Sequence, residues 1–138
     1  MVALLQNLVV QDGRNVYEHM AALVAALGSA NLGASGYSHV GAVVGATYPD
    51  EARALRTRMP QQIFLVPGYG AQGGTAADAA AAFKSDGTGA IVNASRSVLF
   101  AYKEKPYAGM DWKHAIASAA RDFAKDIAAA VAAVTSDK

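Results

Sequence analysis

The sequence predicts an α/β fold in which short parallel strands alternate with helices that cover the sheet. Three observations carry this prediction. Short runs rich in valine and isoleucine recur along the chain, segments with apolar residues at helical spacing separate them, and glycine or proline stands where the runs end. Continuously apolar strands are typical of parallel sheets, because helices bury both faces of such sheets.

In the first half of the chain we expect a helix at 14–27, a strand at 39–45, a helix at 49–59 and a strand at 62–66. Gly28 stands where a left-handed helix end is typical, and Pro49 is tolerated in a first helical turn. Both strands are expected to be buried. The apolar residues that define the first helix are Val16, Met20, Leu23, Val24 and Leu27.

In the second half we expect a helix at 75–84, a strand at 89–93, a short helical stretch around 97–102 and a terminal helix at 111–134. The candidate core residues of the terminal helix are Trp112, Ile116, Phe123, Ile127 and Val131. No linker divides the chain, so residues 1–138 are expected to form one unit. Three parallel strands leave two open edges, which indicates a small complete layer or a part of something larger.

Composition excludes several classes of protein. A hydrophobic content of 53% with 17% charged residues is typical of a globular protein, and a net charge of +1 without a basic stripe excludes nucleic acid and membrane surfaces as partners. The chain has no cysteine, which rules out disulfides and thiolate chemistry. The apolar opening is too short to span a bilayer and carries no basic leader. We therefore expect a cytoplasmic protein.

A glycine-rich loop follows the second strand, over residues 67–74. Its glycines allow the backbone to approach a ligand closely, and the helix expected at 75–84 would add its positive end, which favours an anion such as phosphate. Gln72 offers both a donor and an acceptor. A purely structural glycine turn remains the alternative for this loop taken alone.

Arg96 follows the next strand, in the segment Asn93-Ala94-Ser95-Arg96. A guanidinium can bind phosphate through two hydrogen bonds, although a lone arginine is more often a surface residue. Barrels of parallel strands commonly build a phosphate site from the loops after two neighbouring strands. The loop at 67–74 and Arg96 together therefore predict phosphate binding.

Other kinds of site have weaker support. Residues 68–73 satisfy the dinucleotide pattern G-x-G-x-x-G, but the next strand ends at Asn93 and not at the acid that would bind the ribose. The three histidines have no ligand spacing, so we expect no metal. Asp122, Lys125 and Asp126 are expected to form a solvated helix face with local charge pairing.

The segments 43–47, 64–74 and 90–96 resemble orotidine 5'-phosphate decarboxylase, in its longer-chain bacterial branch, and appear in the order of that family. The string Pro-Gly-x-Gly-Ala-Gln-Gly-Gly, paired with the later arginine, is the most specific part. With the opening Leu5-Gln6-Asn7-Leu8 and the turn at 12–14, the resemblance covers nearly the whole chain. It implies the last three strands of a (β/α)8 TIM barrel with their helices, which is the carboxyl-terminal half of a fold of ~250 residues.

The resemblance also implies a function: conversion of orotidine 5'-phosphate to UMP, without a cofactor, by a homodimer. It places Gln72 and Arg96 on the phosphate, with backbone amides around Gly73, Gly74 and Ser95 assisting. It makes a mobile loop that closes over the ligand from Pro67, Gly68, Tyr69 and Gly70.

The catalytic residues of the family are not found in this sequence. The Asp-x-Lys-x-x-Asp motif of its acid–base tetrad is absent, as is the segment that recognises the pyrimidine. We therefore expect a phosphate-binding half that needs an amino-terminal half-barrel as its partner and is inactive alone. Two alternatives remain: a non-catalytic half-barrel that binds a phosphate ligand, and another phosphate-handling barrel enzyme, such as an epimerase or synthase.

Overall fold

The computed structural model describes residues 2–136, so the ends of the expected unit, Met1 and 137–138, lie outside the described residues. The strands are β1 (Ala42–Val43), β2 (Phe64–Val66) and β3 (Ala90–Val92). The helices are α1 (Val2–Gln6), α2 (Val16–Ser29), α3 (Pro49–Arg58), α4 (Ala76–Ala80), α5 (Arg96–Leu99), the 3-10 helix η1 (Ala101–Lys103) and α6 (Trp112–Ser136).

The three strands form one parallel sheet in the order β1-β2-β3, which confirms the predicted fold class. Each strand is shorter than predicted, yet the ladder continues beyond β1, because the N–H groups of Val44 and Ala46 donate to the carbonyls of Leu65 and Pro67 at 2.9 and 2.8 Å. The sheet hydrogen bonds therefore reach the first residue of the glycine loop.

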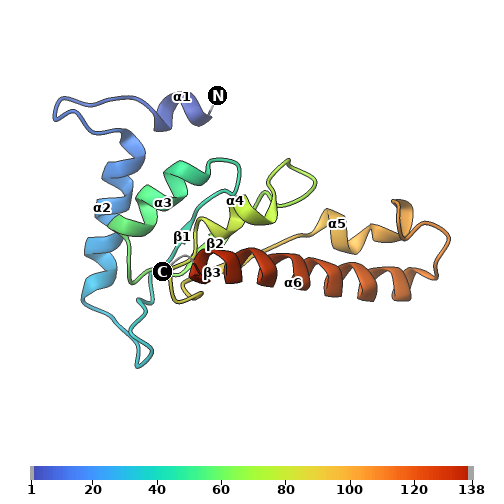
Figure 1. Ribbon diagram of the computed structural model, residues 1–138. Helices are drawn as coiled ribbons and strands as arrows, with labels where there is room; N and C mark the ends of the chain where they lie inside the picture. Colours follow the sequence, from blue (N-terminus) through green and yellow to red (C-terminus); the bar gives the residue numbers. More distant parts are fainter. Residues whose placement is uncertain (1, 137–138) are drawn as a thin grey trace.

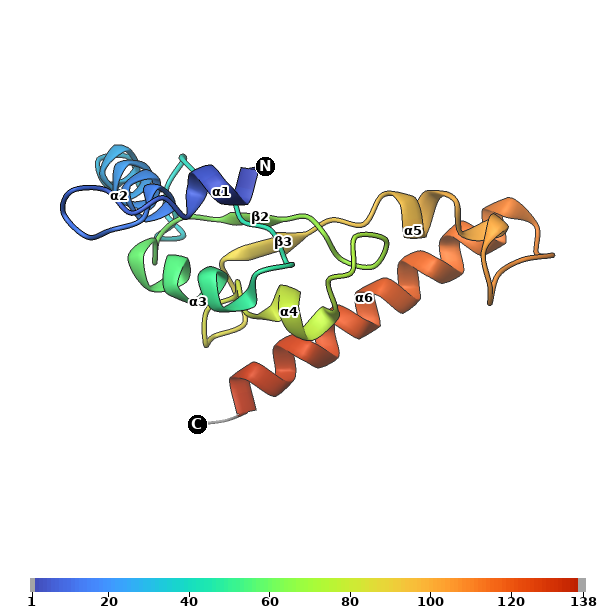
Figure 2. The same cartoon turned by 90° about the horizontal axis from the view of Figure 1, so that it is seen from above.

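The helices lie mainly on one side of the sheet. Figure 2 shows α3, α4 and α6 together on that side, and Figure 1 shows α5 along the amino-terminal half of α6, beyond the end of the sheet. Glu18 joins α2 to α3, because its carboxylate accepts the Asn15 N–H at 2.8 Å and also pairs with Arg58. The core lies between these helices and the side chains of Phe64 and Val66.

Two helices differ from the prediction. The short helix α1 was not expected from the sequence, and α4 ends at Ala80 instead of residue 84. After Ala80 the chain continues in tight turns, in which Ala82 and Phe83 donate to carbonyls three residues earlier. The Ala82 carbonyl accepts a hydrogen bond from Arg56, so this carbonyl makes a tertiary contact and not the hydrogen bond that would continue the helix.

Only one face of the sheet is covered, so the prediction that the strands are buried on both faces is wrong. Phe64 and Val66 are fully buried, whereas their neighbours on the opposite face are exposed: Val43 by 70%, Leu65 by 43% and Ile91 by 59%. These three residues are register partners in adjacent strands and form one apolar row. Side chains of this orientation fill the interior of a closed barrel.

Several apolar positions that define the predicted helices are also exposed, including Trp112, which was predicted as core. Met20, Leu23 and Leu27 of α2 and Trp112 of α6 are each about half exposed or more, while Ile116, Phe123, Ile127 and Val131 are partly buried. The buried positions are instead small ones, such as Ala21 in α2 and Ala115 and Ala119 in α6. Small residues let helices approach closely, so they lie at the contacts while the large side chains lie beside them.

Arg56 of α3 is buried at 8% exposure and connects four segments of the chain. Its guanidinium donates to the carbonyls of Ala82, Met59, Gln62 and Gly89 at 2.7–2.9 Å and stacks 3.6 Å from the ring centroid of Phe64. Burial lowers the pKa of Arg56 below its ordinary value. Since these carbonyls precede or flank β2 and β3, Arg56 fixes the amino ends of both strands.

Replacing Arg56 with alanine should lower the free energy of unfolding by about 3 kcal/mol or more, because four carbonyls lose a charged donor and a buried side chain is removed. The matched control is Arg53→Ala on the same helix, whose guanidinium makes an exposed pair with Asp50 and should change stability by no more than about 0.5 kcal/mol. Urea denaturation measures both. Equal effects for the two variants would contradict the role assigned to Arg56.

Candidate functional site

The loop between β2 and α4 is a closed turn formed by its glycines. Gly68, Gly70 and Gly73 have φ angles of 106°, 72° and 92°, which non-glycine residues rarely adopt. Within the loop the N–H of Gly70 donates to the Gly74 carbonyl at 2.8 Å, and the N–H of Gly74 donates to the Gly68 carbonyl at 3.0 Å. The loop is therefore held by its own backbone.

Gly74 is required at its position for steric reasons. A Cβ atom there would lie 2.7 Å from the Gly68 carbonyl oxygen and 3.0 Å from the Cβ of Ala46, which is fully buried at the end of the sheet ladder. The prediction that the Gly73 and Gly74 amides face a ligand is wrong for this arrangement, because both N–H groups already donate to loop carbonyls. These glycines shape the loop and do not offer donors.

The amino end of α4 also differs from the prediction of an anion site. Thr75 caps this helix: the Asp78 N–H donates to its Oγ1 at 3.1 Å, and its own N–H donates to Asp78 Oδ2 at 2.9 Å. The bond from the Thr75 N–H to the Asp78 carboxylate, and then the bond from the Thr75 hydroxyl to the same carboxylate at 2.7 Å, lower the pKa of Asp78. The carboxylate of Asp78 thus already complements the positive helix end, and the helix is too short for its end to attract a second anion strongly.

Arg96 lies directly after β3, at the start of α5, and its guanidinium is exposed. It is the one arginine in residues 2–136 for which no hydrogen bond or ion pair is found; Arg14, Arg53 and Arg58 pair with acids, Arg56 binds carbonyls and Arg121 donates to Ser118. An exposed guanidinium without a partner keeps all of its donors available for an external anion.

The structure brings most of the predicted phosphate residues together. Gly68, Tyr69 and Gln72 from the loop and Ser95 and Arg96 from the next strand end line one small pocket of about 60 Å³. Pro67, Gly70, Gly73 and Gly74 belong to the same loop but do not line this pocket. Its volume is several times the ~10–15 Å³ that a cavity needs to hold one water, which suits a small group and not a whole nucleotide.

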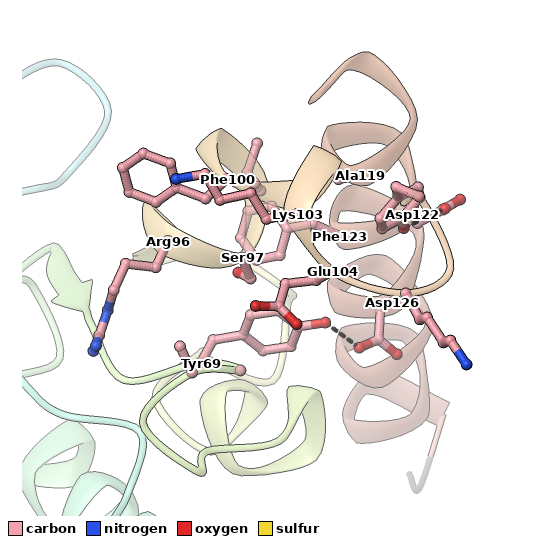
Figure 3. A pocket seen from close by; sticks show the side chains of 15 residues that line it. Tyr69, Arg96, Ser97, Phe100, Lys103, Glu104, Ala119, Asp122, Phe123 and Asp126 are labelled. Atoms are coloured by element: carbon pink, nitrogen blue, oxygen red, sulfur yellow. Dashed lines mark hydrogen bonds between the residues drawn. The ribbon is translucent and has the colours of Figure 1, made fainter. Parts of the chain in front are cut away.

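Tyr69 extends from the same loop toward α6. Its hydroxyl donates to Asp126 Oδ2 at 2.6 Å, and its ring lies 5.0 Å from that of Phe123. Figure 3 shows Tyr69 directed at Asp126, whereas Arg96 extends away from the carboxylates. Burial and then the hydrogen bond to Asp126 raise the pKa of Tyr69 to about 12.

A larger cleft of about 830 Å³ separates the loop and α5 from α6. Asp122 and Asp126 lie on its wall, and the expectation that they form local charge pairs is wrong, because Asp122 accepts the Tyr107 hydroxyl at 2.7 Å just as Asp126 accepts that of Tyr69. Sequence reasoning missed these contacts. The four-residue spacing of the two acids indicates a shared helix face but does not reveal the partners of that face.

Residues 2–136 contain no group of His, Cys, Asp and Glu side chains arranged to hold a metal ion. No helix in the same range is long and apolar enough to cross a membrane. Parallel strands that end in a glycine loop and an unpaired arginine define the class of the protein: it is a partial α/β barrel with a small polar pocket at the carboxyl ends of its strands.

The relatives of the chain are orotidine 5'-phosphate decarboxylases. The enzyme of Rhodopirellula baltica is 47% identical over 119 residues, covering 83% of this chain and 39% of that protein. The enzyme of Caldicellulosiruptor bescii is 40% identical over 126 residues, covering 91% and 40%. The solved structure of Leishmania donovani OMP decarboxylase matches 92% of this chain and 42% of its own chain, at 33% identity and a TM-score of 0.65.

The chain is thus related to part of an orotidine 5'-phosphate decarboxylase, and the predicted resemblance and fold are confirmed. It spans about two fifths of the length of these relatives, which fits a carboxyl-terminal portion. No family model matches it.

The Tyr69–Asp126 contact should make stability depend on pH at the alkaline end. The folded-state pKa of about 12 exceeds the ordinary value of 10.0, so the contribution of Tyr69 is complete below pH 10 and is lost as the pH rises through 12. Wild type should therefore lose more stability over that interval than Tyr69→Phe, as measured by urea denaturation. Tyr48→Phe removes an exposed hydroxyl and serves as control. Parallel curves for wild type and Tyr69→Phe would exclude this linkage.

Proposed function

We propose that this chain supplies the phosphate-binding part of an orotidine 5'-phosphate decarboxylase, a carboxy-lyase that converts orotidine 5'-phosphate to UMP in pyrimidine biosynthesis. The observation that carries the proposal is the unpaired Arg96 beside Gln72 and Ser95, in a small pocket at the ends of β2 and β3. The identity of 47% to an enzyme of that name supports the choice of substrate.

Each residue of the pocket has a distinct role in this proposal. Arg96 neutralises the phosphate and binds it through two N–H groups, and the Gln72 amide contacts a phosphate oxygen and the neighbouring sugar or base. Ser95 assists from the strand end. The segment from Pro67 to Gly70 closes over the ligand, and no cofactor takes part.

The pyrimidine and the reacting carboxylate require a second half of the barrel. The apolar row of Val43, Leu65 and Ile91 and the free edge of β1 support such a partner, because side chains of this orientation pack in the interior of a closed barrel. The proposed occupant is an amino-terminal half-barrel with the remaining strands. A homodimer of the complete enzyme and a cytoplasmic location remain predictions.

The catalytic proton donor is proposed to come from that other half. Decarboxylation needs a lysine ammonium and carboxylates positioned around the substrate carboxylate. The lysines of this chain support an outside source: Lys84 pairs with Asp86 before β3, and neither Lys103, which lines the larger cleft, nor Lys113 lines the 60 Å³ pocket. A surface lysine without positioned acids is an inefficient general acid.

Replacing Arg96 with alanine in a complete enzyme should weaken UMP binding by about 2–5 kcal/mol, the range for removing one partner of a buried charge pair. Arg121→Ala is the matched control, since it removes an equal charge from an exposed site on α6. Calorimetric titration with UMP compares the two variants. Unchanged affinity in Arg96→Ala would remove this residue from the site.

The purified 138-residue chain should release no measurable carbon dioxide from orotidine 5'-phosphate, because phosphate contacts contribute binding energy but donate no proton. Adding the amino-terminal half in trans should restore turnover, and a lysine-to-alanine variant of the Asp-x-Lys-x-x-Asp motif in that half should not. A radiometric assay of carbon dioxide release measures both. Robust turnover by the chain alone would contradict the proposed division of the catalytic residues.

A further inference from the structure

The hydroxyl of Ser97 is a buried polar group without a hydrogen-bond partner in the described residues. Ser97 lies in α5 next to Arg96 and lines the 60 Å³ pocket together with Arg96 and Gln72. Two other side chains in residues 2–136 have a buried oxygen without a partner, Gln6 and Gln62, and neither lines this pocket. An unpaired buried hydroxyl is unfavourable and uncommon, so its position calls for a physical explanation.

Gly70 of the glycine loop lies beside the Ser97 hydroxyl. A Cβ atom built at Gly70 would lie 3.4 Å from Ser97 Oγ and 3.6 Å from Ser97 Cβ, so a larger residue at position 70 would crowd the serine. Gly70 also has a φ angle of 72°. The hydroxyl is thus shielded from solvent by the loop but is paired with no group of it.

We propose that Ser97 is a further phosphate ligand, whose hydroxyl donates a hydrogen bond to an oxygen of the phosphate that Arg96 neutralises. A serine hydroxyl can rotate toward such an oxygen, and a hydrogen bond from a hydroxyl to an anionic oxygen is stronger than one between neutral groups. The segment 67–70, which moves in the proposed function, uncovers this hydroxyl as the ligand enters, and the phosphate then supplies the partner that it lacks. This inference rests on the proposed function, since it assigns a residue to the same pocket.

The test separates a ligand from a merely structural serine by two readouts on the 138-residue chain. Ser97→Ala removes an unpaired hydroxyl, so its urea midpoint should equal or exceed that of wild type. Its affinity for UMP and for inorganic phosphate should fall by about tenfold, the effect of one hydrogen bond to a charged group. Uridine, which has no phosphate and whose base requires the other half of the barrel, should bind neither protein measurably.

Two variants complete the comparison. Ser29→Ala removes a serine hydroxyl that donates to the Ala26 carbonyl at 2.8 Å on α2, and it should leave UMP affinity unchanged. Arg96→Ala reports on the proposed function itself. If Arg96→Ala loses affinity and Ser97→Ala stays within twofold of wild type, the role of Ser97 is refuted and the proposed function stands. If wild type binds neither UMP nor phosphate, or Arg96→Ala binds as well as wild type, both fail.

Discussion

The fold depends on one buried cation, Arg56, that pairs with no carboxylate in residues 2–136. Arg56 spreads its charge over four backbone carbonyls and the ring of Phe64 in β2. The carbonyls belong to the residue after α3, the turn after α4 and the residues before β2 and β3. A buried charge is tolerated only when its donors are satisfied, and here the guanidinium geometry meets that condition without an acid. Arg56 consequently fixes the sheet at the amino ends of β2 and β3. The loops at the carboxyl ends do not have this structural role and can carry polar groups.

At the carboxyl ends of the strands a different interaction holds the structure, because the glycine loop is closed by hydrogen bonds of its own backbone and not by a side chain. The glycine loop closes on itself through the Gly68–Gly74 hydrogen bond and packs on Ala46, so its shape depends on little beyond the end of the ladder. Tyr69 then ties this loop to α6 through Asp126 and Phe123. The 60 Å³ pocket thus lies between this turn and the carboxyl end of β3, where Arg96 is left unpaired, and the 830 Å³ cleft lies between the turn and α6.

Sequence reasoning recovered the strands, their parallel pairing and the proximity of Gln72 to Arg96, because apolar runs and their order report directly on topology. It failed wherever the outcome depended on a neighbour distant in sequence. The partners of Asp122 and Asp126 are tyrosine hydroxyls from other segments, and no spacing rule predicts them. Periodicity also shows which side of a helix is apolar but not whether anything covers it, so Trp112 was predicted as core although it is about half exposed. The Gly73 and Gly74 N–H groups hydrogen-bond within the loop because Gly68, Gly70 and Gly73 have positive φ angles. Composition alone does not specify those angles.

The uncovered face of the sheet has a consequence for the isolated chain in solution. The row of Val43, Leu65 and Ile91 beside the unpaired edge of β1 is a template for any extended apolar segment, including one from another copy. Self-association through this face scales with the square of the chain's own concentration. Three side chains that a closed barrel would conceal therefore make the solubility of the isolated chain depend on dilution.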